Sequence, residues 1–168
     1  MGRIVLLKIL GVLFIVATGT LLHYAYAWSG NAFWVGIIAA TSESVWEHLK
    51  LAFWPAALWT LVGWVLVGRS VQNYWVGRWA ALAVMPIVIV VGFYAYISVL
   101  GHHALVFDLI LFVLAIALGQ LVALAIYRAT PIGGLGRRLA IGAIVVECII
   151  FGSLTFFPPD MPVFSGPI

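Results

Sequence analysis

The sequence predicts an all-α fold, a membrane helix bundle with five transmembrane helices, its N-terminus inside and its C-terminus outside. Three observations lead to this prediction. Of the 168 residues, 65% are hydrophobic and 8% are charged, whereas a soluble domain carries about 25% charged residues. Five apolar stretches approach or exceed the roughly 20 residues that a membrane-spanning helix needs. The basic residues are concentrated on what would be one side of the membrane.

The predicted spans cover residues 4–27, 43–67, 74–100, 103–127 and 139–157, within a single transmembrane domain of residues 1–168. Residues 28–42 are too short and too rich in Gly, Ser and Asn to cross. We expect an interfacial or re-entrant segment there, with Trp28 and Trp34 as headgroup anchors. Pro55 and Pro86 fall near the middle of the second and third spans, where each removes a backbone donor and favours a kink.

The first span has an alternative interpretation. Met1–Ala27 has a basic start, an apolar middle and the triplet Ala25-Tyr26-Ala27, which together are typical of a cleavable signal peptide. We expect the segment to be retained as the first span.

Orientation follows from the distribution of positive charge. With the N-terminus inside, Lys50 is the one basic residue on the outer side, because the other seven lie at the inner ends of spans or between them. We therefore expect a multi-pass protein of a cell membrane, taken as the bacterial inner membrane. The lipid bilayer is the expected partner. A lipid-like small molecule and a second copy of the chain are further expected partners. Nucleic acid is excluded as a partner, because the sequence has no long basic run. The basic residues of the inner side are Arg3, Lys8, Arg69, Arg78, Arg128, Arg137 and Arg138.

Protonatable residues gather on the opposite side. Glu43, Glu47 and Lys50 are spaced i, i+4 and i+7, which places them on one face if the helix begins at Glu43 with Ser42 as its cap. Asp108 would lie roughly 8 Å below His103 at about 1.5 Å per residue. The two groups would meet if the second and fourth spans touch.

Placing several ionised carboxylates in a membrane without matching cations costs free energy. Either some stay protonated, or a divalent metal such as zinc supplies the missing charge. We take Glu43 and Glu47 as candidate catalytic residues and His48, His102 and Asp108 as candidate metal ligands. The other candidate members of this polar site are His23, Ser44, Lys50, His103 and Glu147.

Most of these residues also have a structural interpretation, in which His23 is an interfacial histidine. Glu47 and Lys50 form an ion pair at the headgroup level, and His102 and His103 belong to an interfacial turn. Ser44 is structural rather than a nucleophile. Glu147 is a protonated acid bonded to a neighbouring helix. On sequence alone these alternatives remain open.

The stretch Ser42-Glu43-Ser44-Val45-Trp46-Glu47-His48-Leu49-Lys50 resembles a family of small bacterial membrane proteins of unknown function. That family carries the signature Asn-Glu-Ser-x-Trp-Glu-His-Leu-Lys, in which this chain has Ser42 in place of Asn. The resemblance extends to residues 23–31, 101–108, 118–120 and 158–162. It implies the architecture and supplies no mechanism.

The sequence resembles two other protein families more loosely, one in the chemistry of its polar residues and one in its overall format. Ser44 and His48, with a later His and Asp, are similar to the zinc-dependent membrane hydrolases that include alkaline ceramidases and adiponectin receptors, although the seven spans and the closing His-x-x-x-His are missing. The Trp-rich format is similar to that of tryptophan-rich sensory/translocator proteins, without their Pro-Pro-Gly-Trp run. The sequence thus predicts a membrane protein with an outward-facing Glu/His/Asp site for a metal ion or protons. A metal-dependent hydrolase of a lipid-like substrate and a proton- or cation-coupled transport or accessory protein are the alternatives.

Overall fold

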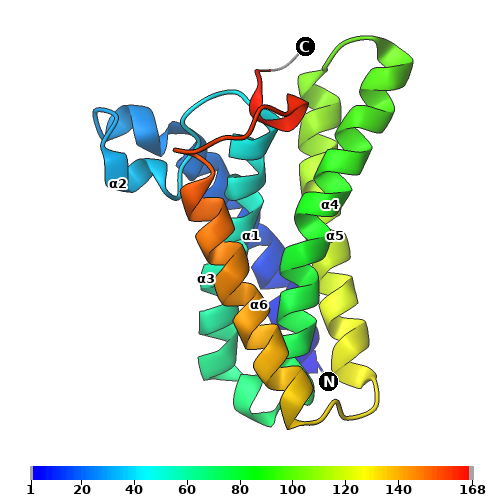
Figure 1. Cartoon of the computed structure of the whole chain (residues 1–168). Coiled ribbons are helices and arrows are strands. Elements are labelled where there is room, and N and C mark those ends of the chain that lie inside the picture. Colours follow the sequence, from blue (N-terminus) through cyan, green and yellow to red (C-terminus); the bar gives the residue numbers. More distant parts are fainter. Residues whose placement is uncertain (1, 167–168) are drawn as a thin grey trace.

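The structure is a computed structural model that describes residues 2–166. In this part of the chain the secondary structure is entirely helical (Figure 1). The α-helices are α1 (Gly2–Trp28), α2 (Phe33–Gly36), α3 (Val45–Leu66), α4 (Tyr74–Leu100), α5 (Leu105–Arg128) and α6 (Gly134–Ser153). Two short 3-10 helices, η1 (Gly68–Ser70) and η2 (Pro162–Phe164), follow α3 and α6.

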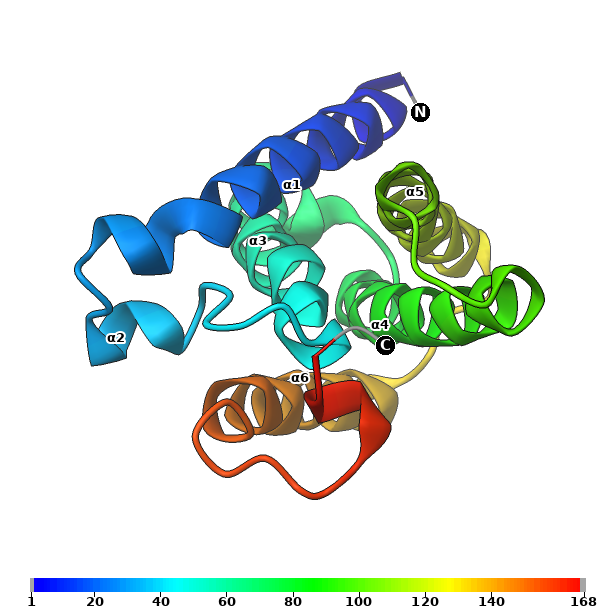
Figure 2. The ribbon, with the colours of Figure 1, turned by 90° about the horizontal axis from the view of Figure 1, so that it is seen from above.

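The five long helices run alternately up and down, so the start of α1 lies at one end of the bundle and the end of α6 lies near the other (Figure 1). α1 and α4 each pack against both α3 and α5, and α6 packs against α4. Seen along the bundle, α1 and α6 lie on opposite sides of α3 and α4 (Figure 2). The start of α1, η1 and residues 129–133 share one end, which we call the basic end. The segment 29–44, the turn 101–104 and residues 154–166 form the other, the acidic end.

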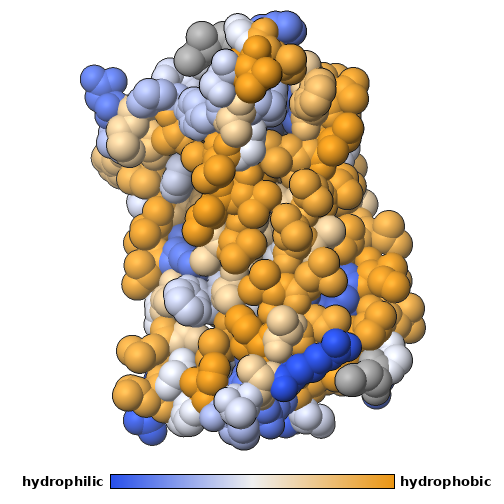
Figure 3. Space-filling model, turned by 90° about the vertical axis from the view of Figure 1, so that its right-hand side faces the viewer, coloured by the Kyte–Doolittle hydropathy of each residue, from blue (hydrophilic) through white to orange (hydrophobic). Residues whose placement is uncertain are grey.

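Four helices, α1, α3, α4 and α5, are long and apolar enough to cross a membrane. Hydrophobic side chains cover most of the middle of the face shown in Figure 3. α6 contains Arg137, Arg138 and Glu147 among its 20 residues, and its crossing stays a prediction. The predicted all-helical class is thus confirmed, with four candidate spans.

The predicted boundaries need three corrections. α3 begins at Val45 rather than Glu43, because Ser44, and not Ser42, is its N-cap: the Ser44 side chain accepts a hydrogen bond from the Glu47 amide. The fifth predicted span begins and ends earlier than expected, as α6. The segment 28–42 includes one helical turn, α2.

Two basic residues that we expected at the membrane surface are turned inward. Arg78 belongs to α4 and is 1% exposed. The Lys8 side chain does not extend along α1 toward the membrane surface. Its ammonium group instead donates hydrogen bonds to Gln120 and Tyr127 on α5.

Asn73 joins two connections at the basic end. Its backbone is left-handed, with φ of 55°, a conformation that Asn tolerates better than most residues. Its side-chain amide donates to the carbonyls of Ile126 and Thr130, and its oxygen accepts from the Ile132 amide. The start of α4 is therefore fixed to the α5–α6 connection.

Stacked aromatic rings attach α6 and the C-terminal segment to α3. Trp46 lies between Phe151 and Phe164, with ring centroids 4.8 Å away on each side. Phe53 stacks on Phe151 at 4.2 Å. These contacts place Thr155 beside the N-terminal turn of α3, where it joins a buried polar network.

Candidate functional site

A pocket of about 290 Å³ lies at the acidic end, between α1, α3, α4 and α5. The polar side chains of its lining are partly or fully exposed, whereas the buried lining residues, which we call its inner side, are apolar. The polar lining consists of Thr20, His23, Tyr24, Glu43, His48, His103 and Asp108. The apolar lining includes the buried Gly19, Leu51 and Ile89 and the half-buried Phe93, Leu111 and Phe112. The volume is close to the lower limit of small-molecule sites, which are about 300–1,000 Å³.

Three of the polar side chains converge on one wall of the pocket. His23 comes from α1, Glu43 precedes α3, and His48 lies in the first turns of α3. The two carboxylate oxygens of Glu43 lie 3.9 Å from His23 Nε2 and 3.5 Å from His48 Nε2. One ligand atom from each residue lies within 4.8 Å of the others. This group, His23–Glu43–His48, could hold a metal ion.

The orientation of His48 is set by the start of its own helix. Its Nδ1 lies 2.9 Å from the carbonyl oxygen of Ser44. A carbonyl only accepts hydrogen bonds, so Nδ1 carries the proton in a neutral ring and Nε2 keeps a free lone pair. Metal-binding histidines commonly have their other nitrogen fixed in this way. His48 therefore presents an acceptor nitrogen toward Glu43.

Asp108 and His103 form the opposite wall, where α5 begins. His103 Nδ1 lies 3.6 Å from Asp108 Oδ2, and the Tyr96 hydroxyl on α4 donates a hydrogen bond to Asp108 Oδ1. Members of both predicted groups therefore line one pocket, although α3 and α5 are not among the helix pairs that pack closely. α1 and α4 bridge these helices.

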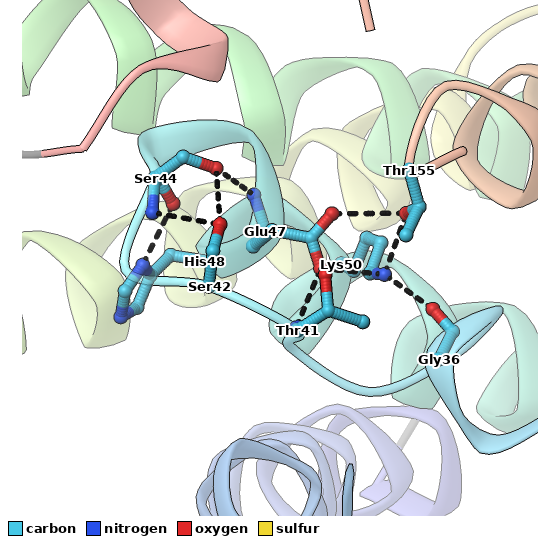
Figure 4. A network of polar contacts seen from close by, with 8 residues as sticks. All are labelled: Gly36, Thr41, Ser42, Ser44, Glu47, His48, Lys50 and Thr155. Atoms are coloured by element: carbon cyan, nitrogen blue, oxygen red, sulfur yellow. Dashed lines mark hydrogen bonds and ion pairs between the residues drawn. The ribbon is translucent and has the colours of Figure 1, made fainter. Parts of the chain in front are cut away.

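Glu47 and Lys50 lie outside this pocket, in a buried network (Figure 4). Lys50 Nζ is 2.8 Å from Glu47 Oε2, and the two side chains are 0% and 4% exposed. Lys50 also donates to the carbonyl of Gly36 and to Thr155 Oγ1, both at 2.7 Å.

Both oxygens of the Glu47 carboxylate accept hydrogen bonds. It accepts from the amide and the hydroxyl of Thr41 and from the hydroxyl of Thr155. The ion pair expected at the headgroup level exists, but it is buried. It joins α3 to the segment after α2 and to the segment after α6.

Three other candidate residues are not brought to the pocket. His102 is exposed, and its Nδ1 is 3.0 Å from the carbonyl of Leu100. Ser44 is 2% exposed and serves as the helix cap, which agrees with its structural interpretation. Glu147 lies on α6, and its Oε2 is buried without a hydrogen-bond partner among the described residues. The expectation that Glu43, Glu47 and Lys50 share one face is wrong, because Glu43 precedes the helix.

One motif in the sequence predicts that Glu43 is separated from Glu47 and Lys50. Ser44-Val45-Trp46-Glu47 has the form of a capping box, Ser-x-x-Glu, which predicts Ser44 as the N-cap. Glu43 would then lie before the helix. The apolar inner lining has no such signal, because its residues come from four helices that are apolar on most faces.

Comparison with known proteins identifies the family. The family model described as "Family of unknown function (DUF6512)" matches residues 3–168. The chain belongs to DUF6512. No curated protein and no solved structure matches it. Membership in DUF6512 supplies no activity, so the function has to be argued from the geometry of the site.

Proposed function

We propose that this DUF6512 chain is a multi-pass membrane protein that binds a divalent transition-metal ion, zinc being the best match, on His23, Glu43 and His48. The observation that carries this proposal is the convergence of two imidazoles and one carboxylate within 4.8 Å at a pocket. Two His and one Glu are a ligand set of catalytic zinc sites, which keep a fourth position open.

The distances suit such an ion. Zinc binds His nitrogen and carboxylate oxygen at about 2.0–2.2 Å, which in tetrahedral geometry separates neighbouring ligand atoms by about 3.4 Å. The nitrogen–oxygen distances of 3.5 and 3.9 Å in the group exceed the 2.7–3.2 Å of a direct hydrogen bond. A bridging cation would draw the three groups together with small side-chain movements.

The apolar inner side of the pocket suggests what binds beside the metal. Phe93, Phe112 and Leu51 offer apolar surface, so an amphiphilic, lipid-like molecule could place its chain there and its polar group at the metal. Asp108 and His103 on the opposite wall would face that polar group. Hydrolysis of such a molecule and proton- or cation-coupled transport are two activities that could use this site.

Membrane orientation completes the proposal. The segregation of Arg and Lys to the basic end favours a cytoplasmic location for that end by the positive-inside rule. The pocket would then open to the outer side. α6 supplies the fifth crossing, because its 20 residues reach about 30 Å at about 1.5 Å per residue, and Leu139, Val145 and Ile149 on it are exposed apolar residues.

Zinc titration of the chelator-treated protein in detergent tests the metal site. We expect one zinc ion per chain, and a loss of affinity of at least about tenfold in His48→Gln and in His23→Gln, since each removes one of three ligands. His102→Gln is the matched control, because it removes an exposed imidazole at the same end of the bundle.

Equal weakening in His102→Gln and His48→Gln would mean that zinc binds loosely to exposed histidines and would overturn the proposal. So would a wild-type protein that takes up no zinc. In that case His23, Glu43 and His48 form ordinary ion pairs, and a proton-linked role gains weight.

A further inference from the structure

A second polar cluster lies at the basic end and has no role in the proposed metal site. Arg78, 1% exposed, donates to Thr60 Oγ1 and Gln120 Oε1 at 2.9 Å and to the carbonyl of Ala56 at 3.1 Å. Lys8 Nζ is 3.3 Å from the same Gln120 oxygen and 4.4 Å from the centre of the Tyr127 ring. Two cations therefore share one neutral acceptor.

This cluster holds positive charge without a carboxylate. Within residues 2–166, every ion pair lies at the acidic end and none includes Lys8 or Arg78. Glu147 lies on α6, on the opposite side of α3 and α4 from α1, which carries Lys8 (Figure 2). Buried charges are normally paired, because an unpaired one pays a large desolvation cost. The arrangement lacks an anion.

Hydrogen-bond donors also exceed acceptors here. Arg has five N–H donors and Lys has three, and the contacts of Arg78 and Lys8 use three and two of them. The amide nitrogen of Gln120, a further donor, is buried and has no partner among the described residues. The Tyr74 hydroxyl is already used, since it donates to the carbonyl of Thr60 at 2.6 Å.

A small cavity of about 20 Å³ borders both cations. A cavity of this size holds about one water-sized group, so it admits one oxygen of a larger anion. Its remaining lining is largely apolar and includes Ile4, Leu7, Trp59 and Val67. Lys8 and Arg78 lie about 9 and 6 Å from the starts of their helices at about 1.5 Å per residue, which is near the membrane surface if α1 and α4 span it.

We propose that Lys8 and Arg78 bind the phosphate group of an anionic phospholipid in the leaflet at the basic end. One phosphate oxygen would enter the cavity and accept from the free donors of both side chains. The apolar residues around the cavity favour a lipid over a free ion, since they would contact the glycerol and acyl part. Basic pockets between membrane helices on the cytoplasmic side are suited to such headgroups.

Native mass spectrometry of the full chain in non-ionic detergent tests this site, with phosphatidylglycerol and phosphatidylcholine as probes. We expect one retained phosphatidylglycerol per chain and at least tenfold weaker retention of phosphatidylcholine. Lys8→Gln should weaken phosphatidylglycerol binding by at least about tenfold, because the phosphate loses a charged donor. Arg3→Gln, which removes an exposed cation from the same helix, should leave it unchanged.

Lys8→Gln is used rather than an Arg78 variant because Arg78 is buried and its loss could prevent folding. Equal binding of the two lipids, or equal weakening in Lys8→Gln and Arg3→Gln, would overturn the site. Protection of the wild-type melting temperature by chloride or inorganic phosphate alone, with no further gain from phosphatidylglycerol, would overturn the lipid as its occupant.

Discussion

The buried ion pair of Glu47 and Lys50 is held by hydrogen bonds from several segments. Lys50 donates three hydrogen bonds, to Glu47, Gly36 and Thr155, which is the full capacity of an ammonium group. The Glu47 carboxylate also accepts hydrogen bonds from Thr41 and Thr155. Such a network stabilises the fold only while both charges are present.

Lys50→Met is therefore expected to destabilise the protein by about 3–5 kcal/mol, because it leaves the Glu47 charge buried without a cation. The melting temperature in detergent measures this loss. Arg138→Met, which removes an exposed cation, should change it little. The double variant Glu47→Gln with Lys50→Met should recover part of the loss, since the buried charge is then absent. A simple sum of the two single effects would contradict the coupling.

The residues that line the pocket show how much of the candidate site the sequence could predict. Protonatable groups within a membrane are costly, which made His23, Glu43, His48, His103 and Asp108 candidates from sequence alone, and the structure places all five at one pocket. Their grouping was predicted incorrectly, because it assumed that the helix begins at Glu43. Because the helix begins two residues later, at Val45, Glu43 leaves the face of Glu47 and lies near His23 and His48. A single cap decides which residues share a site.

At the scale of elements, close helix approach depends on glycine. A Cβ atom added at Gly19 of α1 would lie 2.5 Å from the carbonyl oxygen of Leu51 on α3. That carbonyl is the one whose helical partner is removed by Pro55, since Pro has no N–H. α1 thus lies close against α3 where the α3 backbone lacks one helical hydrogen bond, at residues that also line the pocket.

Gly19→Ala is expected to destabilise the protein by about 1–3 kcal/mol, because backbone cannot yield to the added methyl group and α1 must move. Thermal unfolding in detergent measures the effect. Gly142→Ala on α6 is the control, since nothing lies within 4 Å of the added atom and Ala is the better helix former. Equal melting temperatures for Gly19→Ala and wild type would show that α1 and α3 are less tightly packed than described.

At the scale of the whole molecule, the fold was largely predictable and the helix contacts were not. α4 occupies the predicted residues 74–100, because a long apolar run bounded by polar residues defines a helix without knowledge of its neighbours. Which helices touch depends on shape. Gly19, Phe93 and Phe112 meet at one pocket although no periodic pattern distinguishes them. For the same reason Lys8 and Arg78 were expected at the surface, whereas Gln120 draws both inward.

The arrangement of charge also predicts which ends of the chain face which compartment. The N-terminal residues and the C-terminal segment lie at opposite ends of the bundle (Figure 1), so an odd number of crossings must separate them if the bundle is upright in the membrane. In a Cys148→Ala background, Arg3→Cys and Ser165→Cys place single thiols at exposed positions of the two ends. An impermeant maleimide added to intact cells should label the protein carrying Ser165→Cys and spare the one carrying Arg3→Cys, and permeabilised cells should label both. Labelling of the Arg3→Cys protein alone would reverse the orientation. If both or neither were labelled in intact cells, an even number of crossings would follow, which would remove α6, with its Arg137, Arg138 and Glu147, from the set of spans.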